Sequence, residues 1–201
     1  EKEVNVAFVG KYTELKDSYK SINEALEHAG IKNKTKVNIN FVEAENLTSR
    51  NVNKILKKAD AVLVPGGFGE RGIEGMILAC KYSREKNIPY LGICLGMQVA
   101  IIEYARNVLK LKGANSTEFD QQTKHPVIGL MSEWSDISGK KETRSKNSDL
   151  GGTMRLGGQL CMLKKKSKSY KMYKKEKIVE RHRHRYEVNP KYKSEMINNG
   201  L

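Results

Sequence analysis

The sequence has 201 residues, enough for one well-packed α/β domain or at most two small ones. Hydrophobic residues make up 38% and charged residues 30%, a balance that excludes fibrous and disordered chains. The longest apolar run, residues 90–102, is too short to span a bilayer, and no leader-like segment opens the chain. We therefore expect a cytoplasmic protein with no membrane partner. The three cysteines are widely spaced, so neither a disulfide framework nor a metal site is predicted.

The net charge of +14 raises the possibility of a nucleic-acid partner. Residues 164–177 are rich in lysine, and Tyr170 and Tyr173 interrupt the run as base-stacking side chains would. The same spacing also fits the inward stripe of an amphipathic helix whose lysines face water. Because lysine is abundant along the whole chain, we favour the second interpretation and expect no nucleic acid. A non-catalytic basic binding module stays an alternative.

Predicted strands and helices alternate through the first half of the chain. Strands are predicted at residues 4–9, 36–42, 60–64 and 89–93, and the second lies near a sheet edge because its polar and apolar residues alternate. Three helices are predicted between these strands. The first is capped by Asp17 or Ser18 and stopped by Gly30, and the third covers residues 73–86. Thr48 caps the second, whose inward residues are Val52, Ile55 and Leu56. This alternation predicts an α/β fold with a doubly wound, mostly parallel sheet.

The pattern changes beyond residue 110. Residues 127–131 and 157–163 are predicted strands, and residues 136–140 resemble a hairpin turn, so an antiparallel extension follows the parallel sheet. Residues 148–158 are rich in glycine and show no periodicity. They form either a loop that closes over a site or a plain connector.

Cys94 lies where a predicted strand changes into a helix that begins at Leu95. Gly92 and Gly96 flank it, which gives the Gly-x-Cys-x-Gly spacing of a nucleophile elbow. At a helix N-terminus the unpaired N–H groups favour the thiolate, so we expect a lowered pKa for Cys94. The alternative is a structural cysteine in a buried strand.

A glycine-rich loop, Pro65-Gly-Gly-Phe-Gly69, follows another predicted strand. Its bare N–H groups suit an oxyanion hole, and the N–H of Leu95 would supply a second donor. The segment Gly10-Lys11-Tyr12 also ends a strand, and in a parallel sheet all three strand ends meet on one rim. Acyl transfer through a cysteine thioester is the reaction class that this pattern favours.

Five motifs together resemble the glutaminase domain of the CTP synthase family, over essentially the whole chain. They are Gly92-Ile-Cys-Leu-Gly-Met-Gln98, the loop at residues 65–69, Asn115-Ser-Thr-Glu-Phe119, Asp149-Leu-Gly-Gly-Thr-Met-Arg-Leu-Gly157 and Glu180-Arg-His-Arg-His-Arg-Tyr-Glu-Val-Asn189. The first two indicate only a class I glutamine amidotransferase, which leaves other members of that class, or another hydrolase with a cysteine elbow, as alternatives. The last two are more specific to the CTP synthases.

The resemblance implies a flavodoxin-like fold and a two-part activity. Cys94 would attack the side-chain amide of L-glutamine and release ammonia, which a synthase domain of the same polypeptide would use for the ATP-dependent amination of UTP to CTP. That synthase domain would need ATP and Mg²⁺ and is expected to be absent from residues 1–201. The domain itself is expected to need no cofactor and no metal. Members of the family are activated by GTP, and a homo-oligomer, a tetramer, is expected for the full-length enzyme.

The resemblance also assigns the glutamine site residue by residue. Gly67 and Leu95 would supply the oxyanion-hole amides, Glu118 would hold the α-ammonium group and Arg185 would bind the α-carboxylate as a bidentate donor. The glutamine pocket would be lined by Gly96, Met97 and Gln98. Phe68, Arg144 and Arg155 are hypothetical contributors to the GTP response. From the residues alone, Glu118 could instead cap a turn and Arg185 could be an ordinary surface arginine.

One departure from the family pattern concerns the catalytic base. The family takes its His and Glu from a later Phe-His-Pro-Glu motif, and none of the four histidines, His28, His125, His182 and His184, stands in that context. We expect His182 and His184 to pack or hydrogen-bond locally. The sequence is therefore read as one glutaminase domain over residues 1–201 that lacks its His/Glu segment. On its own it is expected to be weakly active or inactive, since losing the base of a triad costs several orders of magnitude in rate.

Overall fold

The computed structural model describes residues 2–11, 13, 16–130, 133–135, 141–143 and 155–201. The chain forms two compact units, one made of Glu1–Ile128 with Val188–Leu201 and the other of Gly129–Glu187. Each is described separately.

The first unit is built on a four-stranded parallel sheet. Its strands, in the spatial order β2-β1-β3-β4, are β2 (Thr35–Glu43), β1 (Lys2–Gly10), β3 (Ala61–Val64) and β4 (Tyr90–Gly92). The helices between them are α1 (Lys20–Asn33), α2 (Val52–Ile55), α3 (Ile73–Lys86) and α4 (Leu95–Asn107), with short 3-10 turns at Lys16–Tyr19 and Ala44–Asn46. The predicted doubly wound sheet is confirmed, and β2 lies at its edge as expected.

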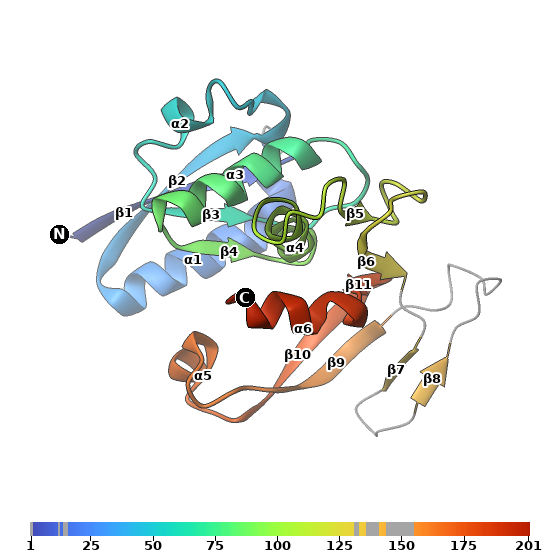
Figure 1. The fold of residues 1–201 in the computed structure, drawn as a ribbon. Helices are drawn as coiled ribbons and strands as arrows, with labels where there is room; N and C mark the ends of the chain where they lie inside the picture. Colours follow the sequence, from blue (N-terminus) through green and yellow to red (C-terminus); the bar gives the residue numbers. More distant parts are fainter. Residues whose placement is uncertain (1, 12, 14–15, 131–132, 136–140, 144–154) are drawn as a thin grey trace. The chain divides into compact units, whose positions relative to one another are not determined.

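Alternating side chains of the central strands build a core on each face of this sheet. Val6, Phe8 and Leu63 form one cluster, against which Ile22 and Leu26 of α1 pack. The alternate positions of β1 and β3, Ala7, Val9, Val62 and Val64, are also buried. On this side Val64 packs on α4, where a Cβ on Gly96 would lie 3.1 Å from the Cβ of Val64. Figure 1 shows α3 and α4 beside each other along the sheet. Because both faces of the sheet are covered by packed side chains, every residue of β3 is apolar.

The ends of α1 differ from the prediction. The helix continues past Gly30 to Asn33 and ends at Lys34 in the left-handed conformation, while its N-cap is Tyr19, which makes no side-chain capping bond. Gly30 is buried, and a Cβ there would lie 2.6 Å from the carbonyl oxygen of Thr35. The glycine is therefore a point of close packing against β2 and not a helix stop.

Helix α2 also begins later than predicted. Its N-cap is Asn51, whose side chain accepts a hydrogen bond from the N–H of Thr48, so Thr48 starts the turn but does not cap the helix. Val52 and Leu56 are buried as predicted, whereas Ile55 is 41% exposed. By contrast, the bounds of α3 match the prediction, and its inward residues Ile73, Met76, Ile77 and Cys80 are all buried.

Two short strands and a C-terminal helix complete the first unit. Strand β5 (Asn115–Ser116) pairs in parallel with β6 (Pro126–Leu130), and α6 spans Pro190–Asn198. The Asn189 side chain caps α6 by accepting a hydrogen bond from the N–H of Lys191, and Pro190 occupies the first helical position, where no donor is needed. Tyr192 and Met196 anchor the helix in the core.

Antiparallel strands make up most of the second unit. Strand β7 (Glu133–Ser135) pairs with β8 (Lys141–Thr143), and β9 (Arg155–Met162) pairs with β10 (Lys177–His184). Helix α5 (Lys168–Tyr173) connects β9 to β10, and β11 (Tyr186–Val188) follows. The antiparallel extension is confirmed. The predicted turn at residues 136–140 and most of the predicted loop, residues 148–154, lie outside the described residues, but residues 155–158 belong to β9 and not to a loop.

The two tyrosines of the lysine-rich run do not form an inward stripe. None of the six residues of α5 is buried, and Tyr173 is 50% exposed. Its hydroxyl donates a 2.7 Å hydrogen bond to Glu180. The helix is too short to present an apolar face, so that part of the prediction is wrong.

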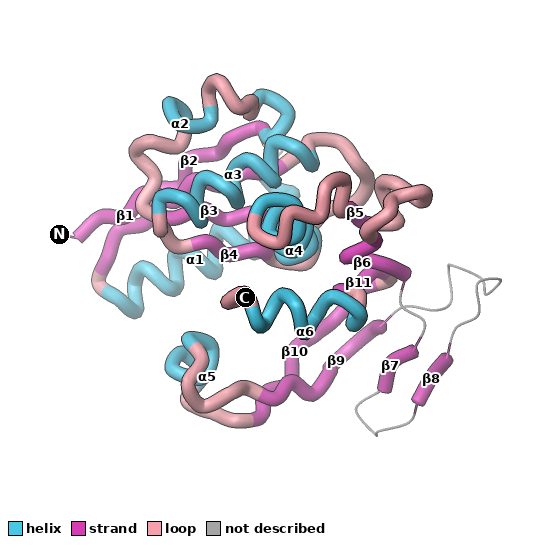
Figure 2. The backbone as a smooth tube through the Cα atoms, in the orientation of Figure 1, coloured by secondary structure: helices cyan, strands magenta, loops and turns pink. Residues whose placement is uncertain are grey.

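The helices are all short (Figure 2). The longest, α1 and α3, have 14 residues, fewer than the roughly 20 that cross a bilayer. Across the described parts of the chain, no helix combines the length and apolar character of a membrane span.

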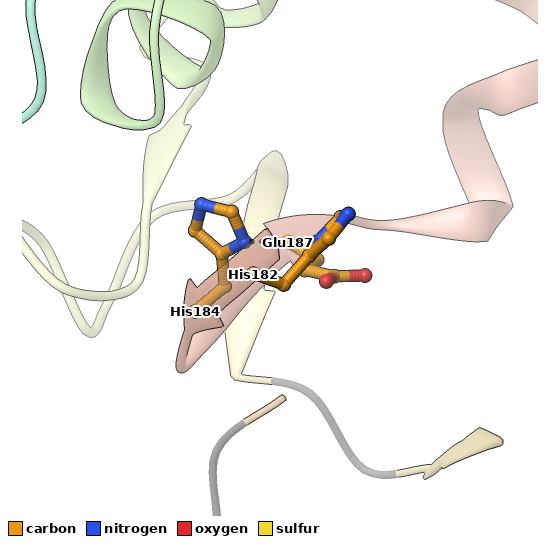
Figure 3. A group of neighbouring side chains, drawn as sticks. All are labelled: His182, His184 and Glu187. Carbon is orange, nitrogen blue, oxygen red and sulfur yellow. Dashed lines mark hydrogen bonds between the residues drawn. The ribbon is translucent and has the colours of Figure 1, made fainter. Parts of the chain in front are cut away.

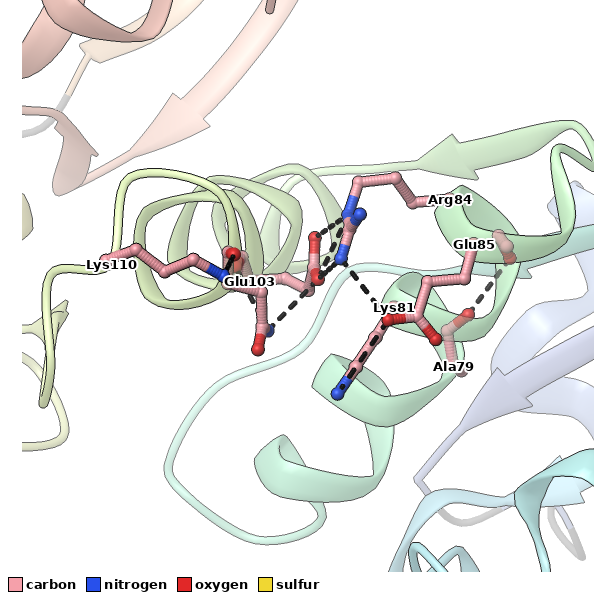
Figure 4. Close-up of polar contacts among 8 residues, drawn as sticks. Ala79, Lys81, Arg84, Glu85, Glu103 and Lys110 are labelled. Carbon is pink, nitrogen blue, oxygen red and sulfur yellow. Dashed lines mark hydrogen bonds and ion pairs between the residues drawn. The ribbon is translucent and has the colours of Figure 1, made fainter. Parts of the chain in front are cut away.

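A buried ion pair joins α3 to α4 (Figure 4). The carboxylate of Glu103 is 1% exposed and accepts three hydrogen bonds of 2.8–3.2 Å from the guanidinium of Arg84. Asn107 adds a 3.1 Å bond to the same carboxylate. Arginine is suited to this role because its planar fork contacts both carboxylate oxygens at once.

We predict that Arg84→Ala lowers the free energy of unfolding by about 3 kcal/mol, because it leaves the Glu103 carboxylate buried without its cation. Lys81→Ala is the matched control. Its partner Glu85 lies 3.9 Å away and both side chains are exposed, so the loss should stay under about 0.5 kcal/mol. Urea denaturation followed by circular dichroism measures both, and equal losses would show that Arg84 does not compensate the buried charge of Glu103.

Candidate active site

Cys94 occupies a strained turn between β4 and α4. Its backbone has φ 53° and ψ −106°, a conformation that a residue with a side chain rarely adopts. Hydrogen bonds hold it there on both sides, because the N–H of Ile93 donates to the Val64 carbonyl at 2.9 Å and the N–H of Met97 donates to the Cys94 carbonyl at 3.1 Å. The predicted nucleophile elbow is present.

The two flanking glycines are required by close backbone contacts. A Cβ on Gly96 would lie 2.1 Å from the carbonyl oxygen of Val64, and a Cβ on Gly92 would lie 2.5 Å from the backbone of Gly96. Neither contact can be relieved by moving a side chain, since both involve main-chain atoms. The first turn of α4 therefore packs directly on the end of β3, with Cys94 between them.

The loop after β3 faces the thiol. A Cβ on Gly66 would lie 3.4 Å from the Cβ of Cys94 and 4.0 Å from its sulfur, and the backbone N–H groups of Leu95 and Gly67 act to lower the pKa of the thiol. A negative charge that develops beside the sulfur would meet the same two donors. The loop after β3 and the start of α4 therefore meet at the thiol, and the oxyanion-hole role of Gly67 and Leu95 stays a prediction.

The pKa of Cys94 is shifted in the direction opposite to our expectation. Burial raises it above the ordinary value, the two backbone hydrogen bonds from Leu95 and Gly67 oppose that rise only in part, and the Glu118 carboxylate adds to it. Desolvation outweighs the helix N-terminus because the sulfur is half-buried. A raised pKa favours the thiol over the thiolate, so a base would be needed for the predicted reaction of Cys94 as a nucleophile.

Lys11 fixes the loop opposite the thiol, and sequence analysis did not find this role. The side chain is only 4% exposed, and its ammonium group donates hydrogen bonds to the carbonyl oxygens of Phe68 at 2.9 Å and Gly69 at 2.6 Å. Burial lowers the pKa of Lys11, and the nearby Glu118 carboxylate opposes that shift. The contact confirms that the ends of β1 and β3 meet on one rim.

Glu118 contacts the same loop from the other side. Its carboxylate accepts a 3.1 Å hydrogen bond from the N–H of Gly69, and its own N–H donates to the hydroxyl of the buried Ser116. Lys11 therefore binds the carbonyl group of Gly69, and Glu118 binds the N–H group of the same residue. A half-buried carboxylate in this position can accept further hydrogen bonds from a cationic ligand.

A comparison with known proteins identifies the family. The class-I glutamine amidotransferase family model matches residues 14–201. The chain belongs to the class I glutamine amidotransferases. Among solved structures, it is similar to the glutaminase domain of Trypanosoma brucei CTPS with bound acivicin, with 39% sequence identity and a TM-score of 0.85. The match covers 98% of this chain and 72% of that one.

The other predicted pocket residues of this amidotransferase lie on the first turn of α4. Leu95 and Gln98 are buried, whereas Met97 is 36% exposed beside them. Phe68, at the tip of the loop, is 74% exposed. The turn therefore presents backbone and the Met97 side chain outward, and it keeps Gln98 inside.

The remaining predicted residues of the amidotransferase belong to the second unit. Arg185 is exposed in a bend between β10 and β11. Arg155 lies in β9 and forms a 3.2 Å ion pair with Glu187. Arg144 lies outside the described residues.

His182 and His184 interact locally, as predicted. Their Nδ1 atoms lie 3.2 Å apart, and Glu187 lies close to both (Figure 3). Sequence analysis missed this grouping. The signal was the His-x-His spacing, which places both rings on one face of a strand once residues 177–184 are recognised as one.

We predict that the rate at which iodoacetamide alkylates Cys94 keeps rising with pH above the pH at which the rate for a free cysteine levels off. A raised pKa means less thiolate at any given pH, so the midpoint of the rate profile should lie above the ordinary value of 9.0. Peptide mapping by mass spectrometry would follow the site, with an unstructured cysteine peptide as reference. A midpoint below that of the peptide would show that the helix N-terminus outweighs burial.

We further predict that Lys11→Met slows modification of Cys94 by an electrophilic glutamine analogue roughly tenfold, because the loop that presents Gly67 loses two charged hydrogen bonds. Alkylation by iodoacetamide needs no oxyanion donor and depends on Gly67 only through the pKa of the thiol, so it should slow much less, which makes it the internal control. A parallel fall of both rates would indicate general unfolding instead of a displaced loop.

Proposed function

We propose that this chain is the glutaminase domain of a CTP synthase and hydrolyses L-glutamine through a thioester on Cys94. The observation that carries the proposal is the strained turn that holds the Cys94 side chain against the Gly66-Gly67 loop at the start of α4. The 39% identity to a CTPS glutaminase domain, over 98% of the chain, supports the choice within the family.

The geometry suits each step of amide cleavage. The Cys94 sulfur attacks the side-chain carbonyl carbon of glutamine, and the proton of the thiol passes to a base. The carbonyl oxygen becomes an oxyanion that accepts hydrogen bonds from Gly67 and Leu95. When the C–N bond breaks, ammonia leaves with that proton, and a γ-glutamyl thioester remains. Water then attacks the thioester, which releases glutamate and restores the thiol.

Recognition of the amino-acid end rests on two charged residues. We assign the α-ammonium group to Glu118, which already contacts the oxyanion loop at Gly69. We assign the α-carboxylate to Arg185, whose guanidinium can bind both oxygens. Gly96, Met97 and Gln98 would line the pocket for the methylene groups. A substrate bound to Glu118 would also steady the loop that carries Gly67.

The wider activity follows from the same proposal. Ammonia would pass to a synthase domain that aminates UTP with ATP and Mg²⁺, within a cytoplasmic homotetramer. Phe68, Arg144 and Arg155 are proposed contributors to activation by GTP. Phe68 is exposed beside Gly67, so a ligand that contacts it could reach the oxyanion loop. The 201 residues alone are proposed to turn over slowly, because none of their histidines lies in the base motif of the family.

The proposal predicts that an electrophilic glutamine analogue modifies Cys94 in preference to Cys80 and Cys161. Burial raises the pKa of Cys80 to about 12, so that thiol stays protonated and shielded. L-Glutamine should protect Cys94, whereas D-glutamine should not. Intact-protein mass spectrometry followed by peptide mapping measures both effects, and even labelling of the three cysteines would count against the proposal.

Two variants test recognition of the substrate. Glu118→Gln and Arg185→Lys should each slow labelling by the analogue, by at least about tenfold, since each removes a charge or a bidentate contact. Arg183→Lys is the matched control, because Arg183 is an exposed neighbour in the same motif with no proposed role. If the control slows labelling as much as Arg185→Lys, the carboxylate assignment is wrong.

A further inference from the structure

The second unit contains a group of three side chains with ligand atoms suited to a metal ion. His182 and His184 stand on one face of β10, and Glu187 follows in β11 (Figure 3). One ligand atom from each residue lies within 4.8 Å of those of the other two. None of the three has a role in the proposed glutaminase reaction.

We propose that His182, His184 and Glu187 form a binding site for a divalent transition-metal ion of the zinc class. Two imidazoles and one carboxylate are a donor set that zinc takes in proteins, with water completing a tetrahedral shell. The proposal is independent of glutamine hydrolysis.

The spacing of the two histidines matches a chelating pair. Their Nδ1 atoms are 3.2 Å apart. Two nitrogens bound to one tetrahedral Zn²⁺ at 2.0–2.1 Å would lie about 3.3 Å apart, so the rings need almost no movement. Two facing lone pairs at this distance repel each other, unless a proton or a metal ion lies between them.

The surroundings keep the imidazoles neutral and leave room above them. Burial lowers the pKa of both histidines. The charge of Arg155 lowers the pKa of His182 further, against the opposing effect of Glu180, and His182 and Arg155 both lower the pKa of His184. Across the ladder, His182 pairs with Gly157, and a Cβ added at that glycine would meet no atom within 4 Å. On the far side of the His182 ring, Nε2 lies 4.0 Å from the sulfur of Cys161, which helps to fix the ring orientation.

Arg155 is the group that opposes a cation. Its Nε atom lies 3.2 Å from Oε1 of Glu187, and the two half-buried side chains form an ion pair. A bound metal ion would compete with the guanidinium for this carboxylate. Arg155 therefore sets the affinity, and removing its charge should strengthen metal binding while every ligand stays in place.

The test is titration of the chelator-treated 201-residue chain with Zn²⁺ by isothermal calorimetry, in a Cys94→Ala background that removes a competing thiol. We expect one ion per chain. His182→Asn and His184→Asn should each weaken binding by more than about 100-fold, which is the upper range for loss of an outer contact. His28→Asn changes an exposed histidine on α1 and should leave the affinity unchanged.

Two further readouts keep the test decisive if a histidine variant folds poorly. Co²⁺ should give the intense visible absorption of a four-coordinate ion with the parent chain, and Arg155→Gln should bind Zn²⁺ more tightly, by at least about tenfold. Equal Zn²⁺ affinity for the parent and His184→Asn would overturn the proposal. So would a Co²⁺ spectrum no stronger than that of the free aqueous ion.

Discussion

The active site depends on the contact between Gly96 and the carbonyl group of Val64. A Cβ at this glycine would lie 2.1 Å from the oxygen, so the first turn of α4 packs on the end of β3 as closely as main chains can. The same carbonyl accepts the N–H of Ile93, which fixes the turn before Cys94. The loop that carries Gly67 continues directly from β3. The end of β3 therefore positions both Cys94 and the loop that carries Gly67.

This tight arrangement has an electrostatic consequence. Close packing buries the sulfur, and burial raises the pKa of Cys94 despite the donors from Leu95 and Gly67. Those donors offset the effect of burial only in part, but in the proposed reaction they would stabilise the oxyanion that forms during amide attack. The loop is held by Lys11 and Glu118 before substrate arrives, so no reorganisation is needed at that moment. Such a site would stabilise the charge of the transition state more than that of a resting thiolate. The proposed reaction would therefore require a base that removes the proton of the thiol.

Local features were predictable from sequence and distant contacts were not. The elbow was predicted because its glycines, its cysteine and the change of periodicity lie within a few residues of one another. Gly30 was misread as a helix stop because only its contact with the Thr35 carbonyl distinguishes a packing glycine from a cap. Lys11 showed no signal, since its partners Phe68 and Gly69 lie 57 and 58 residues away along the chain. The pKa of Cys94 was misjudged for a similar reason, because burial depends on tertiary packing.

The basic motif of β10 shows how strand geometry divides one charged run into separate environments. Side chains alternate across the strand, so Arg181 and Arg183 are exposed, while His182 and His184 lie on the protected face. Arg185 follows the last strand residue and lies in a bend, where neither face constrains it. Exposed arginines and a pair of neighbouring imidazoles thus arise from five consecutive residues. The net charge of the motif therefore says little about its partners, because position along the strand decides what each residue can contact.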